Sequence, residues 1–96
     1  MDEASRKLAR IFNALSNPNR LQIYSEIVKS EKTDYEVGSG CLLSEVVGTL
    51  KIGSPTISHH VKELVNAGLI LADRQGKFLV CRVNPEIREM LRRLFG

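Results

Sequence analysis

Apolar residues at helical spacing mark the first two elements of the chain. Between residues 2 and 15, apolar side chains recur at positions i, i+3, i+4 and i+7, which lines one side of a helix. These residues are Leu8, Ile11, Phe12 and Leu15. Asn17 and Pro18 then form a typical N-cap and first-turn pair, which opens a second helix that should end near Ser30. Its apolar residues are Leu21, Tyr24, Ile27 and Val28.

The middle of the chain alternates polar breaks with short elements. Residues 30–40 are polar, include two glycines and follow no period, which predicts a loop. "CLL", residues 41–43, is then a candidate short strand, and Ser44 is a candidate N-cap for a short helix. Its apolar residues are Val46, Val47 and Leu50. "KIGS" reads as a tight turn, after which Ser54 caps a new helix.

The helix after Ser54 carries apolar residues at i, i+4, i+7 and i+8 and should stop at Gly68. These are Ile57, Val61, Leu64 and Val65. Two apolar runs, "LILAD" and "KFLVCRV", flank "RQG", where Gly76 can adopt the positive φ of a hairpin turn. Asn84 and Pro85 repeat the cap-and-proline signal and open a last helix. Its apolar stripe consists of Ile87, Met90, Leu91, Leu94 and Phe95.

This order of elements predicts a mostly α fold with a small β-hairpin. Two short helices joined by a tight turn and followed by a basic two-stranded hairpin form a winged helix-turn-helix. We expect one such domain over residues 1–96, with the order helix, helix, short strand, helix, helix, hairpin, helix.

Charge is distributed unevenly along the chain. The formal net charge is +3, and the segment from Lys51 to Arg82 carries all of it, with five basic and two acidic residues. An anionic partner should therefore meet the second half of the fold. No apolar run reaches the ~18 residues of a membrane span, and the first residues lack a signal-like apolar stretch, so we expect a cytoplasmic protein.

The adjacent residues His59 and His60 do not suggest a metal site or an enzyme. Neighbours on a helix point about 100° apart, whereas a helical chelate needs i and i+4 spacing. No nearby Cys, Asp or third His completes a zinc set, and no nucleophile or paired carboxylate accompanies the pair. We therefore predict no cofactor, no metal and no catalytic residue.

The outward face of the helix after Ser54 is instead typical of a recognition helix. His59 points away from the apolar stripe together with Thr56, Lys62, Glu63 and Asn66. Hydroxyl, imidazole and amide groups can read base edges in double-stranded DNA, while Lys and Arg hold phosphates. His60 lies on the flank of the stripe, where packing at the edge of the core competes with base reading. An ordinary solvated helix is the simpler alternative for this face.

Three stretches resemble the ArsR family of winged-helix transcriptional repressors over about residues 8–96: "LSNPNRLQIYSEIV", "SPTISHHVKELVNAGLI" and "DRQGKFLVCRVN". The resemblance implies a DNA-binding repressor that is not an enzyme. It also implies a homodimer formed by the first and last helices, bound to an inverted-repeat operator and released by a chemical signal. By matching position, Arg74 and Lys77 lie on the wing. The implied recognition-helix residues are Ser54, Thr56, Ser58, His59 and His60.

Dimerisation also has support from the apolar pattern. The first and last helices carry more apolar surface than so small a core needs, so a partner should cover part of it. The alternative is that both stripes pack inside one monomer. A winged-helix protein-interaction module, with a protein bound on the outward face, is the other functional hypothesis.

The inducing signal is constrained by what the chain lacks. Metal sensors of the family carry a Cys-x-Cys pair where this chain has "GCLLSEVV", and others use Asp and His on a last helix that here reads "NPEIREMLRRLFG". Neither metal site is intact. Cys41 and Cys81 remain: the family's fold would pair their strands, which permits a redox or sulfur switch. Inert packing of Cys81 and a soft-metal or arsenite site at Cys41 across the dimer are the alternatives.

Overall fold

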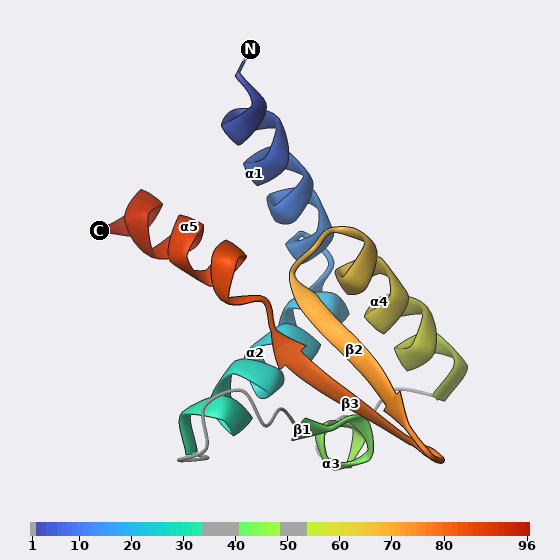
Figure 1. Ribbon diagram of the computed structural model, residues 1–96. Helices are drawn as coiled ribbons and strands as arrows, with labels where there is room; N and C mark the ends of the chain where they lie inside the picture. Colours follow the sequence, from blue (N-terminus) through green and yellow to red (C-terminus); the bar gives the residue numbers. More distant parts are fainter. Residues whose placement is uncertain (1, 34–40, 49–53) are drawn as a thin grey trace.

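The computed structural model describes residues 2–33, 41–48 and 54–96 of the chain. The described helices and strands follow the predicted order, and the fold is mostly helical with an antiparallel hairpin (Figure 1). The helices are α1 (Glu3–Leu15), α2 (Pro18–Thr33), α3 (Leu43–Val47), α4 (Ser54–Asn66) and α5 (Pro85–Phe95). The strands are β1 (Cys41–Leu42), β2 (Ile70–Gln75) and β3 (Phe78–Val83). No described helix is both long and apolar enough to cross a membrane.

Side chains at the N-termini of the first two helices fix where they begin. The Oδ1 atom of Asp2 accepts a 2.7 Å hydrogen bond from the Ser5 amide. Asn17 Oδ1 accepts bonds from the amides of Asn19 and Arg20 at 2.9 and 3.2 Å, so the predicted N-cap is confirmed. The predicted end of the second helix near Ser30 was one turn short, because the helical backbone continues to residue 33.

Two other boundaries also differ from the prediction. Helix α3 begins at Leu43, so Ser44 is its second residue and not the residue that precedes it. Likewise, α4 includes Ser54 in its first turn. Such shifts of one residue are the usual uncertainty of helix ends. The loop predicted at residues 30–40 was wrong for residues 30–33, which belong to α2, and its residues 34–40 lie outside the described residues. Of the turn predicted at residues 51–54, Ser54 belongs to α4, and residues 51–53 lie outside the described residues, as does Leu50.

The three strands form an antiparallel sheet in the order β1, β3, β2. In the β2–β3 hairpin, Gln75 pairs with Phe78, which leaves Gly76 and Lys77 as a two-residue loop. Gly76 has φ +64°, a conformation that suits glycine because it has no Cβ. Strand β1 lies on the other side of β3, where the register pairs Cys41 with Cys81. The wing is therefore joined to the chain that precedes the helix-turn-helix.

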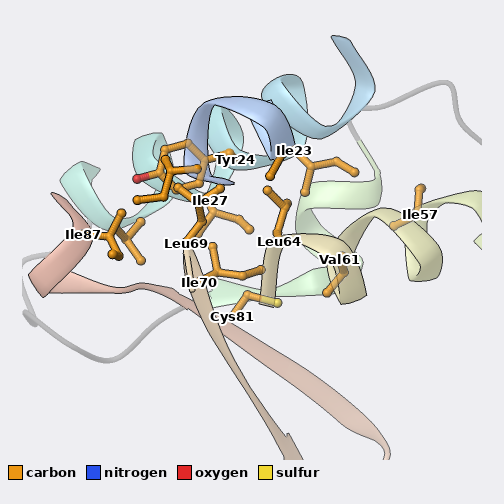
Figure 2. Close-up of a cluster of buried hydrophobic side chains, with 13 residues drawn as sticks. Ile23, Tyr24, Ile27, Ile57, Val61, Leu64, Leu69, Ile70, Cys81 and Ile87 are labelled. Atoms are coloured by element: carbon orange, nitrogen blue, oxygen red, sulfur yellow. The ribbon is translucent and has the colours of Figure 1, made fainter. Parts of the chain in front are cut away.

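The core lies where α2, α4, the base of the hairpin and the start of α5 meet (Figure 2). Four of its fully buried side chains are Ile27, Leu64, Ile70 and Ile87. The predicted stripe of the second helix was partly wrong: Leu21 is 47% exposed, whereas Ile23 is fully buried. Leu21 lies about a third of a turn from the centre of the buried face of α2. The predicted stripe included Leu21 and omitted Ile23, so its centre was displaced from the face that is buried.

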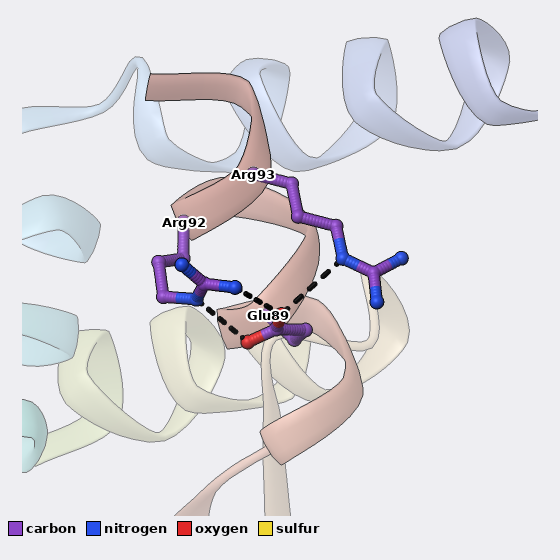
Figure 3. Close-up of polar contacts among 3 residues, drawn as sticks. All are labelled: Glu89, Arg92 and Arg93. Atoms are coloured by element: carbon purple, nitrogen blue, oxygen red, sulfur yellow. Dashed lines mark hydrogen bonds and ion pairs between the residues drawn. The ribbon is translucent and has the colours of Figure 1, made fainter. Parts of the chain in front are cut away.

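The side chain of Asn84 holds the start of the last helix to the rest of the fold. Asn84 Oδ1 accepts a 3.1 Å hydrogen bond from the Glu86 amide, and its Nδ2 donates to the Gly68 carbonyl at 2.8 Å. The end of α4 and the start of α5 are therefore tied together. On the exposed side of α5, Glu89 accepts hydrogen bonds from Arg92 and Arg93 (Figure 3). The bonds from Arg92 are the main reason that the pKa of Glu89 falls to about 2.

Candidate nucleic-acid interface

Helix α4 presents a polar outer face because its apolar residues anchor it to the core. Ile57, Val61 and Leu64 are buried. The intervening positions are exposed: Thr56, Ser58, His59, Lys62 and Asn66. These are residues that the sequence nominated for DNA contact, and they form one continuous surface along the helix. Ser54 belongs to the first turn of α4, but its side chain lies outside what the structure describes.

The two histidines occupy opposite environments. His59 is exposed, while His60 is only 6% exposed and faces the core. Their ring centroids are 5.8 Å apart with the planes tilted by 52°. The burial of His60 favours packing over base contact, so the reading surface is smaller than the sequence suggested. Among the residues that the structure describes, no group of three or more His, Cys, Asp or Glu could hold a metal ion.

The burial of His60 leaves one of its ring nitrogens without a hydrogen-bond partner among the described residues. Its Nδ1 is buried and accepts or donates no hydrogen bond within the described part of the chain. Burial lowers the pKa of His60, and the positive charge of Arg20 and the neighbouring His59 lower it further. Arg20 itself donates from Nε to the carbonyl of Ala14 at 2.7 Å. The neutral imidazole is thus the form that suits this site.

The hairpin adds cationic side chains beside α4. Arg74 near the end of β2 and Lys77 in the loop are both exposed. Lys77 Nζ lies 5.5 Å from the ring centroid of Phe78, within the range of a cation–π interaction. Phe78 is itself 46% exposed, and sequence reasoning did not single it out. Phe78 lies at the start of β3, one position out of the alternation that buries Cys81 and Val83, so its ring remains in solvent at the end of the hairpin.

Two adjoining hollows separate α4 from the hairpin. They measure about 350 and 310 Å³, and both are lined by Leu43, Ser58 and Leu79. No sequence pattern signals these hollows, because their lining residues come from elements far apart in the chain. We call this feature the α4–hairpin groove. Its further residues include Lys62 and Val65 on α4, Ala72 and Arg74 on β2, and Lys77 in the loop.

The chain is similar in sequence to known transcriptional regulators. No family model matches the chain. An uncharacterised HTH-type transcriptional regulator of Methanocaldococcus jannaschii is 31% identical over 91 residues, which cover 94% of this chain and 93% of that protein. A probable mercury resistance operon repressor of Streptomyces lividans is 32% identical over 84 residues, which cover 86% of this chain but only 60% of that protein.

The fold has solved counterparts. A crystal structure described as an ArsR family transcriptional regulator superposes with a TM-score of 0.74 and 20% identity, covering 99% of this chain and 89% of that one. The likeness spans the helix-turn-helix, the hairpin and both terminal helices. The chain therefore belongs to the HTH-type transcriptional regulators, which are DNA-binding proteins and not enzymes, and it has the fold of the ArsR family structure.

Proposed function

We propose that this chain represses transcription as a homodimer bound to an inverted-repeat operator, with α4 in the major groove. The observation that carries the proposal is the polar outer face of α4 beside the cationic hairpin. Thr56 and His59 supply base-edge contacts, whereas Ser58, Lys62, Arg74 and Lys77 hold phosphates. Ser54 is proposed as a contact on the sequence argument alone. His60 supports the helix from the core side.

The homodimer is supported by apolar surface that one protomer leaves uncovered. On α1 and α5, the exposed fractions of Phe12, Leu94 and Phe95 are 39%, 51% and 75%. The rings of Phe12 and Phe95 meet edge to face with centroids 6.2 Å apart, so the two helices present one joint patch. Exposed apolar patches of this kind mark association sites. Both helices lie away from the hairpin tip, which leaves α4 accessible in the pair (Figure 1).

Two-fold symmetry then sets the form of the operator. In a symmetric pair the two α4 helices face the same way, so they read two inverted half-sites about 34–36 Å, or one helical turn, apart. Occupation of such a site over a promoter excludes polymerase. This geometry makes repression the direct consequence of binding.

The test is a binding titration with the DNA upstream of the protein's own gene and with random duplex of equal length. The proposal predicts tight preference for the upstream DNA and a two-fold symmetric footprint. Because each phosphate contact releases counterions, about 6–10 contacts should cost roughly 10³ to 10⁵ in affinity between about 50 and 200 mM salt. Absence of preference at every salt concentration would point to the protein-interaction module instead.

We further propose that Cys41 and Cys81 form the switch that releases DNA. The register pairs them directly across β1 and β3, and opposite residues of an antiparallel pair have Cα atoms about 4.5–5.5 Å apart, inside the range of a disulfide. A peroxide oxidises one thiolate to sulfenic acid with loss of hydroxide. The second thiolate then attacks that sulfur, which expels the oxygen as a second hydroxide.

Mass spectrometry and DNA binding test the thiol switch together. Peroxide should remove two hydrogens per protomer and abolish operator preference, and dithiothreitol should restore both. Cys41→Ser should keep binding but lose the response. If operator binding persists after complete oxidation, or if no disulfide forms, the cysteines are packing residues and the switch is refuted. The full burial of Cys81 is consistent with such a packing role.

A further inference from the structure

The α4–hairpin groove combines an aliphatic floor with a cationic rim. Its two hollows share three lining residues, so they form one continuous depression along the flank of α4. From Ile57 to Val65 the helix rises by about 12 Å at 1.5 Å per residue, which sets the length of the groove. Together the hollows reach the size of sites that hold small molecules, about 300–1,000 Å³.

The floor of the groove consists of aliphatic side chains, which form no hydrogen bonds or ion pairs with water or phosphate. It is formed by Leu43, Val61, Val65, Ala72 and Leu79. Val65 is 38% exposed, although it belongs to the apolar stripe of α4. The register explains the sheet side of the floor: Arg74 pairs with Leu79 and Ala72 with Cys81, so these residues share the face that fronts α4. Among the described residues of the floor, Val65 and Ala72 are exposed, Leu43 and Leu79 are partly buried, and Val61 is buried.

The rim carries only positive charge among the residues that line the groove. Lys62 projects from α4, Arg74 from β2 and Lys77 from the hairpin loop. The hydroxyls of Ser44 and Ser58 add hydrogen-bond donors. Asp73 alternates with Ala72 and Arg74 along β2, so it belongs to the opposite face of the sheet. The groove therefore complements a molecule with an anionic head and an apolar tail.

We propose that the α4–hairpin groove binds an amphipathic monoanion, such as a medium-chain carboxylate, and that its occupation excludes DNA. The phosphates of a DNA strand could pair with the cationic side chains of the rim, but they would leave the aliphatic floor exposed to water. An alkyl chain covers that floor while the carboxylate meets the rim. The exclusion of DNA rests on the proposed function, because Ser58, Lys62 and Arg74 serve both ligands. The binding itself does not.

Direct calorimetric titration without DNA tests the site. The probes are hexanoate, octanoate and decanoate, with decanol as the uncharged match. Because each buried methylene is worth a fixed increment, the dissociation constant should fall roughly threefold to fourfold per added carbon. Decanol should bind much more weakly than decanoate. Affinity that ignores chain length would reduce the groove to a simple anion site and overturn the proposal.

A matched pair of variants locates the ligand. Val65→Gln places an amide in the floor and should weaken decanoate binding about tenfold, since it removes part of the buried aliphatic area. Leu21→Gln makes a similar change at an exposed site on α2 and should leave it unaltered. Both positions are solvent-accessible, so both variants should fold. Equal affinity of the two variants would place decanoate elsewhere, for example on the apolar patch of α1 and α5, and refute the site.

Competition with operator DNA then separates the two proposals. Decanoate should release the operator from the unmodified protein, and about tenfold more should be needed with Val65→Gln. Binding of decanoate by a protein that shows no operator preference would support the groove as a ligand site and refute the proposed repressor function. Operator binding that is indifferent to saturating decanoate would sustain the repressor and remove the regulatory role of the groove.

Discussion

The proposed DNA contacts fall into two groups according to where the side chains lie. His59 is exposed beside Thr56, whereas Lys77 contributes from the hairpin loop. An imidazole can read a base edge, but a lysine ammonium on a flexible stem meets any phosphate. Specificity and general affinity should therefore respond to different substitutions.

The substitutions His59→Ala and Lys77→Ala test this division. His59→Ala should reduce the preference for the operator over random duplex by ~1–3 kcal/mol, because a base contact is lost. Lys77→Ala should weaken both DNAs about equally and reduce the salt slope by about one. Fluorescence anisotropy at several salt concentrations measures both quantities. Equal losses on both DNAs for His59→Ala would remove its base-reading role.

The buried His60 should make the stability of the fold depend on pH. Burial, followed by the charges of Arg20 and His59, lowers its pKa below the ordinary 6.5, so the folded state favours the neutral ring. The unfolded chain binds more protons below pH 6.5, and stability is present above that value and lost as pH falls through the folded pKa. Urea unfolding between about pH 7.5 and about pH 5 should show this decline.

A comparison of two variants assigns the pH dependence of stability. His60→Gln should flatten the decline, because it removes the buried titrating ring. His59→Gln should retain it, because the buried ring is still present. If both variants keep the same slope, the decline comes from other groups and the burial of His60 has no energetic consequence for protonation.

At the scale of elements, Asn84 joins three parts of the fold. It caps α5 and ties that helix to Gly68, which lies in the link between α4 and β2. Gly68 has φ +81°, and the Leu69 amide returns to the Leu64 carbonyl at 3.0 Å, a common helix ending. The position of α4 therefore depends partly on a residue outside that helix.

Asn84→Ala should lower the free energy of unfolding by about 1–3 kcal/mol, since it removes a cap and leaves a partly buried carbonyl without its donor. Asn84→Ser keeps a cap acceptor and loses only the bond to Gly68, so it should cost less. Urea titrations followed by circular dichroism measure both. Identical losses would show that the cap contributes nothing beyond the link to Gly68.

At the scale of the whole molecule, the apolar patch of α1 and α5 should govern assembly and DNA binding together. Phe95→Ala should weaken the dimer by about 2 kcal/mol, or about thirtyfold in dissociation constant, because aromatic residues dominate such interfaces. Operator binding should then require higher protein concentration. Sedimentation at several concentrations gives the dimer constant, with Leu21→Gln as an exposed control on α2. An unchanged constant would mean that the patch is not the interface.

The sequence alone determined much of this protein, because its signals are local. Paired Asn-Pro caps, helical spacing and Gly76 predicted the helices and the hairpin. The charge surplus of residues 51–82 led to the proposal that this half of the fold faces DNA. The exposed face of α4 followed from the 3.6-residue period once its apolar stripe was known. The resemblance to a repressor family supplied the function that these elements serve.

Tertiary structure decided what depends on how the elements pack. Only the packing of α2 against the core shows that Ile23 is buried and Leu21 exposed, and only the register of three strands pairs Cys41 with Cys81. The burial of His60 and the α4–hairpin groove likewise arise from contacts between segments far apart in the chain. Periodicity assigns a residue to a side of its own element, but the neighbouring element decides whether that side is covered.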